Sequence, residues 1–139
     1  MRPLLLSLLL SLAACAQLPA GNDQLYHELG AQAGITRIVE GMLLNIARDP
    51  RIAHHFDNID IVRLRDKLVE QICVEAGGPC TYTGDSMEES HKGLHLTPGD
   101  FNALVENLEQ AMNAEGIAIP AQNRLLARLA PMRGQVIDR

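Results

Sequence analysis

The chain has 139 residues and a formal net charge of −5, which suit one acidic domain of ordinary size. Its 12 Lys and Arg residues form no cluster or stripe, so the sequence argues against a nucleic-acid partner. Aromatic residues are scarce and no stretch alternates apolar and polar residues as a strand would, so we expect an all-α protein.

The N-terminus carries an export pattern. Residues 4–14, LLLSLLLSLAA, are as long as the core of a secretory signal and too short to span a membrane as a helix. Small residues before Cys15 are typical of bacterial lipoprotein signals, in which that Cys is acylated. We therefore expect a signal peptide at 1–14, a tether at 15–22 and a domain at 23–139, exported to the periplasmic side. Ala16 after the Cys favours lipid anchoring to the outer membrane; a plain signal peptide or a retained anchor are the alternatives.

Helical signals begin after this tether. Asn22 and Asp23 can cap a short helix at 24–29, which Gly30 ends. Gly34 is predicted to open a second helix, which fades near Asp49 and is followed by a short turn, PRIAHHF. Its apolar stripe at helical spacing comprises Ile35, Ile38, Val39, Met42, Leu43 and Ile46.

A long helix capped by Asp60 follows, and Gly77-Gly78-Pro79 stops it. It has two adjacent apolar faces, one formed by Ile61, Leu64, Leu68 and Ile72 and the other by Val62, Val69, Cys73 and Ala76. Two apolar faces predict a helix that packs on other helices with one side and turns the other toward something else.

The remaining elements surround a short turn that presents His91 and stops at Gly93. Thr97, Pro98 and Asp100 form a capping arrangement that opens another helix, which Gly116 ends. The last helix starts near Pro120, and Pro131 inside it predicts a kink or break. We expect two antiparallel helix pairs joined through the loop that carries His91.

Two features of that loop suggest chemistry. A single imidazole on a short, separately positioned turn is a suitable axial donor to a metal or cofactor, although an ordinary surface His is the alternative. Cys73 and Cys80 flank the Gly-Gly-Pro turn in an exported chain, so they form either a disulfide or two small buried apolar side chains.

Taken together, these motifs resemble the truncated globins, the two-over-two helical haem proteins, and their group 1 in particular. The resemblance runs from Leu25 to about Ile137 and rests on LYHELG, RDPRIAHHF, GGPCTYTG and MEESHKGL. It implies a two-over-two helical sandwich with haem b as the cofactor.

The resemblance also assigns residues to the haem. The family's proximal His aligns with His91, which would ligate the iron. Arg63 and Lys67 would pair with the propionates, and some relatives use a Lys at the position of Lys67 as a second iron ligand. Positions that line the haem in relatives are Phe56, Ile61, Leu64, Leu68, Ile72, Tyr82, Met87, Leu96 and Phe101; for Phe56 and Tyr82, plain packing is an equally good account.

One departure from the family bears on function. Relatives that hold oxygen firmly have a Tyr on the second helix and often a Gln on the long helix, where this chain has Leu43 and Leu68. The expected distal wall of Met42, Leu43, Leu64 and Leu68 is therefore apolar and donates no hydrogen bond. We therefore expect oxygen to bind weakly and to dissociate fast. The remaining candidate donors are Lys67, Gln71 and the pair His54 and His55.

Three functions remain open from the sequence. The first is a gas-binding globin for oxygen, CO or NO, with oxygen binding or transport and with nitric-oxide dioxygenation in doubt because the donors are missing. The second is a six-coordinate redox or gas-sensing module with Lys67 as second ligand, served by an unidentified reductase or redox partner. The third is a helical lipoprotein without haem. In each, the membrane is a partner through a lipid on Cys15.

Overall fold

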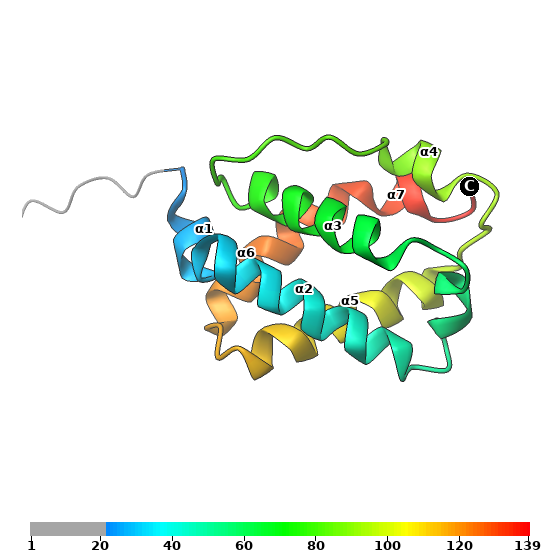
Figure 1. Ribbon diagram of the computed structural model, residues 1–139, viewed down its shortest axis with the longest axis horizontal. Helices are drawn as coiled ribbons and strands as arrows, with labels where there is room; N and C mark the ends of the chain where they lie inside the picture. Colours follow the sequence, from blue (N-terminus) through cyan, green and yellow to red (C-terminus); the bar gives the residue numbers. More distant parts are fainter. Residues whose placement is uncertain (1–21) are drawn as a thin grey trace, which may run out of the picture.

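The structure is a computed structural model that describes residues 22–139, so the predicted signal peptide at 1–14, Cys15 and the tether up to residue 21 lie outside the described residues. The described part is helical throughout, with one isolated bridge between Leu96 and Ile137 (Figure 1). Its helices are α1 (Gln24–Glu28), α2 (Ala31–Ala47), α3 (Ile61–Glu75), α4 (Met87–His91), α5 (Pro98–Ala114), α6 (Ile119–Leu129) and α7 (Arg133–Val136), with 3₁₀ turns η1 (Ala53–Phe56) and η2 (Ala130–Met132).

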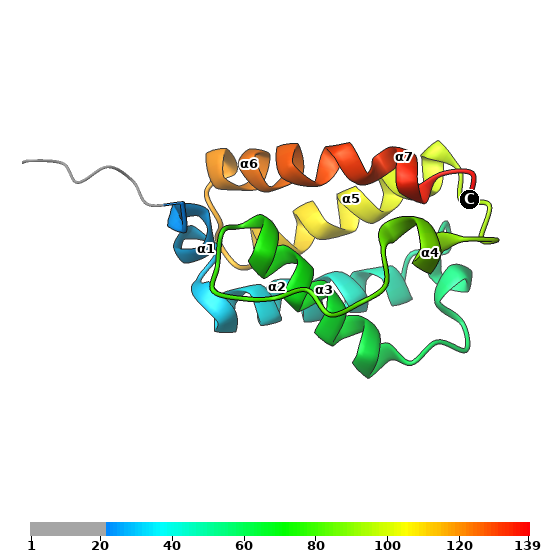
Figure 2. The same ribbon diagram turned by 90° about the horizontal axis from the view of Figure 1, so that it is seen from above.

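The long helices form two layers. Figure 2 shows α2 and α3 in one layer and α5 and α6 in the other, with the members of each pair antiparallel. The short helix α4 lies at the end of the molecule beside α7 (Figure 1). The all-α sandwich of two helix pairs predicted from the sequence is confirmed.

Side-chain caps explain where α3 and α5 start. The side chain of Asp60 accepts a hydrogen bond from the Arg63 amide at the start of α3. Thr97 and Asp100 form a reciprocal capping box at the start of α5, with Pro98 in the first turn. Each cap satisfies an amide that a helix start leaves without a partner, which stabilises the helix by roughly 1 kcal/mol.

The predicted start of α2 at Gly34 is wrong, because the helix begins at Ala31. Gly30, with φ of +88°, makes the left-handed turn between α1 and α2, and Gly34 lies in the first turn of α2. A Cβ atom on Gly34 would clash with the carbonyl oxygen of Leu29. Gly34 is therefore needed for the close approach of α1, rather than to open a helix.

The hydrophobic core lies between α2 and the second layer. Ile35, Ile38 and Val39 of α2 are fully buried, as are Met112 of α5 and Leu125 of α6. Complete burial of side chains of this size contributes about 1.5–3 kcal/mol each. α3 adds Val69, Ile72 and Cys73 to this core, which are the residues of its inward side.

The last helix is interrupted, as the sequence predicts. Pro131 lies within η2, which separates α6 from α7. Proline has no amide proton to donate and its ring crowds the preceding turn, so the α-helical ladder breaks there. The break lets α7 reach α4 (Figure 2). Among residues 22–139, no helix is both long and apolar enough to cross a membrane.

Candidate functional site

His91 occupies the last residue of α4, and its ring is held at one nitrogen. Ser86 caps this helix by accepting a hydrogen bond from the Glu89 amide. The Nδ1 atom of His91 lies 2.7 Å from the carbonyl oxygen of Met87 and 3.0 Å from the hydroxyl of Ser90. A carbonyl oxygen can only accept, so Nδ1 is the protonated donor. The Nε2 atom is then left with a lone pair, as a metal-ligating His requires.

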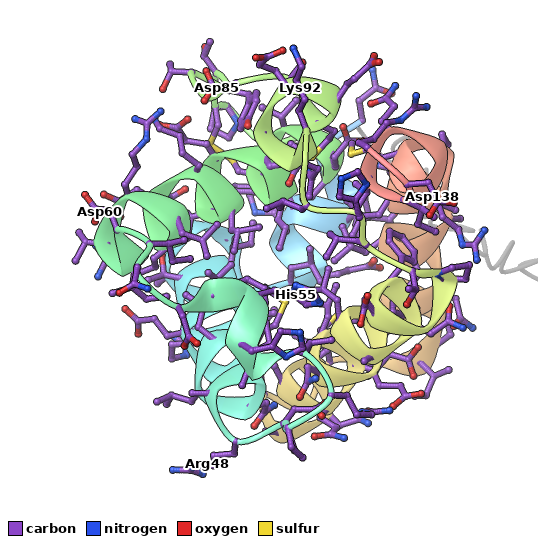
Figure 3. All side chains as sticks on the ribbon, turned by 90° about the vertical axis from the view of Figure 1, so that its right-hand side faces the viewer. Arg48, His55, Asp60, Asp85, Lys92 and Asp138 are labelled. Carbon is purple, nitrogen blue, oxygen red and sulfur yellow. A yellow bond between two sulfur atoms is a disulfide. The ribbon has the colours of Figure 1, made fainter. Side chains whose placement is uncertain are left out.

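Several apolar side chains predicted to contact the haem are only half-buried. Residues of the hydrophobic core on α2, such as Ile38 and Ile46, are at most 2% exposed. In contrast, one set of apolar residues from α2, η1, α3, α4 and α5, together with the loop before α5, is only partly covered by protein: Leu43, Phe56, Leu64, Leu68, Met87, Leu96 and Phe101. Figure 3 looks toward the end of the molecule that holds α4 and α7, where side chains lie between α3, α4, α7 and α5.

Three other predicted residues, Met42 of the distal pocket and Ile61 and Ile72 of the haem lining, differ from this set in their exposed fraction. Met42 and Ile72 are 2% and 3% exposed and belong to the hydrophobic core, whereas Ile61 is 48% exposed at the start of α3.

The donor set suits a planar apolar cofactor with one axial nitrogen. The free Nε2 of His91 offers one coordination bond, and the incompletely covered apolar side chains offer apolar contact surface. Within the described part of the chain, no group of three or more His, Cys, Asp or Glu side chains could hold a metal ion by itself. The residues present thus fit haem.

The three leucines predicted to form the distal wall are partly covered by protein. Leu43 of α2 and Leu64 and Leu68 of α3 are half-buried. His55, a candidate donor, is instead directed at Asp100, with Nε2 3.5 Å from the carboxylate (Figure 3 labels His55). The backbone amide of Thr97 and then its hydroxyl, with a smaller contribution from His55, hold the pKa of Asp100 below its usual range.

Gln71, the other neutral candidate donor, points to the α4 side. Its Nε2 atom lies 3.1 Å from the sulfur of Met87 and 3.2 Å from the sulfur of Met132 in η2. Thioethers are weak acceptors, so this amide is only lightly held. It joins α3 to α4 and η2, a contact that the sequence pattern did not indicate.

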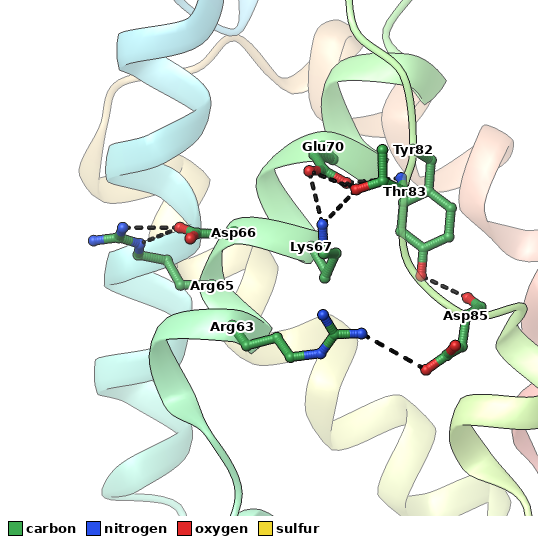
Figure 4. Close-up of polar contacts among 8 residues, drawn as sticks. All are labelled: Arg63, Arg65, Asp66, Lys67, Glu70, Tyr82, Thr83 and Asp85. Atoms are coloured by element: carbon green, nitrogen blue, oxygen red, sulfur yellow. Dashed lines mark hydrogen bonds and ion pairs between the residues drawn. The ribbon is translucent and has the colours of Figure 1, made fainter.

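Lys67 is engaged in a polar cluster with Glu70 and Thr83 (Figure 4). Its Nζ atom donates to Glu70 Oε1 at 2.9 Å and to the hydroxyl of Thr83 at 2.5 Å. The Thr83 amide also donates to Glu70 Oε2 at 2.9 Å. This amide, followed by the Lys67 ammonium, lowers the pKa of Glu70 to about 2. To ligate iron, Lys67 would have to leave both partners and lose its proton.

Arg63, the other predicted propionate partner, is loosely held one turn earlier. Its guanidinium lies 3.9 Å from the Asp85 carboxylate, and both side chains are more than half exposed (Figure 4). The hydroxyl of Tyr82 donates to the carbonyl of Asp85 at 2.7 Å, and burial raises the pKa of Tyr82. A Cβ on Gly84 would clash with the Tyr82 ring. Packing and a loop hydrogen bond therefore account for Tyr82 and Gly84 of the YTG motif.

Cys73 and Cys80 form a disulfide with their Cα atoms 6.0 Å apart. Cys73 is fully buried on α3, and Cys80 begins the segment that leads to α4. The Gly77-Gly78-Pro79 turn reverses the chain between them, with Gly77 at φ of +80° and the Gly78 amide bonded to the Cys73 carbonyl. The bridge fixes the start of this segment to α3.

The C-terminus holds the loop that follows α4. The amide of His95 donates to the carbonyl of Arg139, and the amide of Asp138 donates to the carbonyl of Leu96, both at 3.0 Å. The guanidinium of Arg133 on α7 lies 5.7 Å from the centre of the Phe101 ring, a cation–π arrangement. Sequence reasoning missed these contacts, because they join segments that no local pattern relates.

Comparison with known proteins identifies the family of this arrangement. The family described as bacterial-like globin matches residues 24–138. The chain belongs to the bacterial-like globin family. The group 1 truncated haemoglobin of Nostoc commune is 30% identical over 115 residues, covering 83% of this chain and 98% of that protein. The group 1 truncated haemoglobin of Mycolicibacterium paratuberculosis is 26% identical over 112 residues, covering 81% and 82%.

A solved structure of this family has the same fold. The crystal structure of truncated haemoglobin from Tetrahymena pyriformis in its Fe(III) form superimposes with a TM-score of 0.80 at 25% identity, covering 83% of this chain and 98% of that one. The prediction of a group 1 truncated globin with haem as cofactor is thereby confirmed. The roles of individual residues in this globin stay predictions that follow from the geometry above.

Proposed function

We propose that this globin binds haem b through Nε2 of His91 and takes a diatomic gas on the opposite face, against Leu43, Leu64 and Leu68. One observation carries the proposal. The Met87 carbonyl holds Nδ1 of His91 at 2.7 Å, which fixes the tautomer and leaves Nε2 as the free donor.

Each part of the chain has a task in this binding. Bound haem would be held by the His91 imidazole and would supply the iron to which the gas binds. The Met87 carbonyl orients the imidazole and increases its basicity as a ligand. Phe56, Leu96 and Phe101 provide apolar contact that keeps water away. Arg63, weakly tied to Asp85, is the cation available for a propionate.

The apolar side chains of the distal wall keep the oxygen affinity low. Iron-bound oxygen carries partial negative charge, and a charge-assisted hydrogen bond to it is worth about 1.5–3 kcal/mol, or roughly 10- to 150-fold in affinity. Leu43, Leu64 and Leu68 donate no such bond. His55 and Lys67 are paired elsewhere, and the Gln71 amide is turned to the sulfurs of Met87 and Met132. The protein therefore binds oxygen weakly and discriminates little against CO or NO. Fast nitric-oxide dioxygenation is the activity that this pocket supports least.

The place of action is the periplasmic side of a membrane, with a lipid on Cys15 as the anchor. The support is the residue pattern at 4–15, an apolar run that ends in Leu-Ala-Ala-Cys. Expression in an exporting bacterial host, followed by fractionation, tests this location. The protein should enter the membrane fraction, and Cys15→Ser should be released from it; equal partition of both proteins would contradict lipid anchoring.

Absorption spectra test the haem proposal. The purified protein should show a strong Soret band in the oxidised, reduced and CO-bound states, with a five-coordinate ferrous form. His91→Ala should lose haem or bind it with an altered spectrum, because α4 has no other His that could replace this ligand. His27→Ala, which removes an exposed imidazole on α1, is the matched control and should behave as the wild type. Normal haem binding by His91→Ala would overturn the assignment.

The six-coordinate alternative has no support of its own in the contacts of Lys67. Its ammonium has two partners at 2.9 and 2.5 Å, Glu70 and Thr83. A redox or sensing role that depends on Lys67 ligation would first have to break this cluster. A low-spin, six-coordinate ferrous spectrum in the absence of gas would nevertheless favour it.

A further inference from the structure

The segment between α3 and α4, residues 77–86, runs back along α3 and is attached to it at three points. We call this segment the strap. Cys80 is bonded to Cys73, Thr83 is bonded to Glu70 and Lys67, and Asp85 approaches Arg63. Later residues of the strap thus meet earlier residues of α3. The bonds of Cys80 and Thr83 hold the strap to α3 before the chain enters α4, whereas the approach of Asp85 to Arg63 is loose (Figure 4 shows the contacts of Thr83 and Asp85).

Glu70 makes the middle attachment and uses both carboxylate oxygens. Oε2 accepts hydrogen bonds from the Thr83 amide at 2.9 Å and from the Thr83 hydroxyl at 3.0 Å. Oε1 accepts a hydrogen bond from Lys67 Nζ at 2.9 Å. The Glu70 side chain is 28% exposed, so these bonds are partly shielded from water. The backbone amide contact matters most, because a backbone donor ties the path of the chain itself and does not depend on a side-chain rotamer.

The helix that follows cannot fix its own position. α4 has five residues, a single turn, and helices this short are not stable without tertiary support. Ser86, its N-cap, is three residues beyond Thr83. The placement of α4 therefore depends on the strap before it and on α7 and the C-terminal residues beside and after it.

We infer that Glu70 is a positioning residue for His91, acting through the Thr83 amide and the strap. This inference rests on the proposed role of His91 as the iron ligand. Glu70 has no contact with His91 itself. By fixing Thr83, it restricts where the turn of α4 can lie and hence the direction of the imidazole.

The test compares variants of the full chain loaded with haem. Glu70→Ala removes the middle attachment, and Thr83→Val removes the hydroxyl contacts but keeps the amide. Asp66→Ala is the matched control, since Asp66 lies on the same helix and its carboxylate is bonded to Arg65. Haem loss to excess apomyoglobin, the iron–histidine stretching band of the ferrous protein, and amide hydrogen exchange of α4 in the haem-free protein are the measurements.

Glu70→Ala should lose haem about three- to ten-fold faster than the wild type, the range expected when one or two hydrogen bonds of ordinary net strength are lost. The effect is limited because the disulfide still holds the strap at Cys80. The iron–histidine band should shift or broaden, and α4 amides should exchange faster. Thr83→Val should fall between wild type and Glu70→Ala, and Thr83→Ser should restore wild-type behaviour.

Each outcome separates this inference from the proposed function. If the wild type binds haem through His91 but Glu70→Ala and Asp66→Ala both match it in all three measurements, Glu70 has no positioning role. Equal effects of Glu70→Ala and Asp66→Ala would also overturn the inference, because they would report general helix destabilisation. Failure of the wild type itself to bind haem would overturn the proposed function instead.

Discussion

Single residues divide the proposed chemistry between the two faces of the cofactor. On one side, His91 is prepared as a ligand by a hydrogen bond from Nδ1 to the Met87 carbonyl. On the other, Leu43, Leu64 and Leu68 offer contact without any donor. Retention of the haem thus depends on the first face, and the gas affinity depends on the second.

Adding a donor to the second face should strengthen oxygen binding. Leu43→Tyr places a hydroxyl where related globins have one, and oxygen dissociation should slow by roughly 10- to 150-fold, the value of a charge-assisted hydrogen bond. Leu43→Phe, which adds a ring without a hydroxyl, is the control and should slow it little. Stopped-flow replacement of oxygen by CO measures both rates. Equal rates for the two variants would place residue 43 away from the bound gas.

The contacts of Lys67 lead to a separate expectation. Because Glu70 and Thr83 hold its ammonium, Lys67→Met should leave the spectrum of the ferrous, gas-free protein unchanged. Met keeps the length and the apolar stem but has no charge. Absorption and magnetic circular dichroism detect any change in coordination. Conversion of a low-spin form to a high-spin form by this one substitution would identify Lys67 as a ligand.

Among the elements, the strap and α4 depend most on distant parts of the chain. The strap has no regular secondary structure between Gly77 and Ser86, and its shape comes from the disulfide, the Glu70 bonds and the packing of Tyr82 over Gly84. α5 is the opposite case, because its capping box and apolar stripe are local. Local sequence therefore specifies α5, whereas α4 needs its neighbours.

Removal of the disulfide should destabilise the fold without abolishing it. Cys73 and Cys80 close a short loop, with a sequence separation of 7, and a bridge of this kind is worth about 2 kcal/mol. We expect Cys73→Ser with Cys80→Ser to lower the urea midpoint of the haem-free protein. Cys80→Ser alone should have a similar effect because it leaves a buried thiol at Cys73. Unchanged midpoints, with the bridge shown intact in the wild type, would contradict this expectation.

For the whole molecule, carboxylates that accept hydrogen bonds in the folded state make the stability of the fold depend on pH. The pKa of Glu70 falls from 4.5 to about 2, first through the Thr83 amide and then through Lys67. Hydrogen bonds from Arg51, and next from Asn107, hold the pKa of Asp49 well below its usual value. A lowered folded-state pKa gives stability that is complete above the unfolded pKa and is lost as pH falls through the folded value.

Thermal unfolding of the haem-free protein should therefore show a falling melting temperature as pH decreases from about 5 toward 2, with little change between pH 5 and 7. Glu70→Gln should reduce the slope of this decline, since the titrating carboxylate is absent. Circular dichroism across the pH series measures it. A melting temperature that stays constant down to pH 2.5 would show that these bonds do not contribute to stability.

Much of this protein follows from local signals in the sequence. The caps at Asp60 and Thr97, the turn at Gly77-Gly78-Pro79 and the break at Pro131 depend on backbone chemistry within a few residues, and the structure has all of them. The apolar stripe of α2 likewise predicted its buried face. The start of α2 was predicted wrongly because Gly34 is present for packing: a side chain there would clash with the Leu29 carbonyl, and the local pattern of residues does not show this contact.

Only the tertiary structure decided what each polar side chain contacts. Periodicity predicts that Lys67 and Gln71 lie beside the apolar face of the long helix, but it does not predict the partner to which each side chain is hydrogen-bonded. The fold turns Lys67 to Glu70 and Thr83, Gln71 to two methionine sulfurs, and His55 to Asp100. The physical reason is that hydrogen bonds have a reach of about 3 Å, so they depend on how distant segments pack. The sequence determined that His91 would stand on a short turn, and the contact that leaves its Nε2 free is also local, with the Met87 carbonyl four residues earlier. The tertiary structure decided where that turn lies, because a helix of five residues needs α7 beside it.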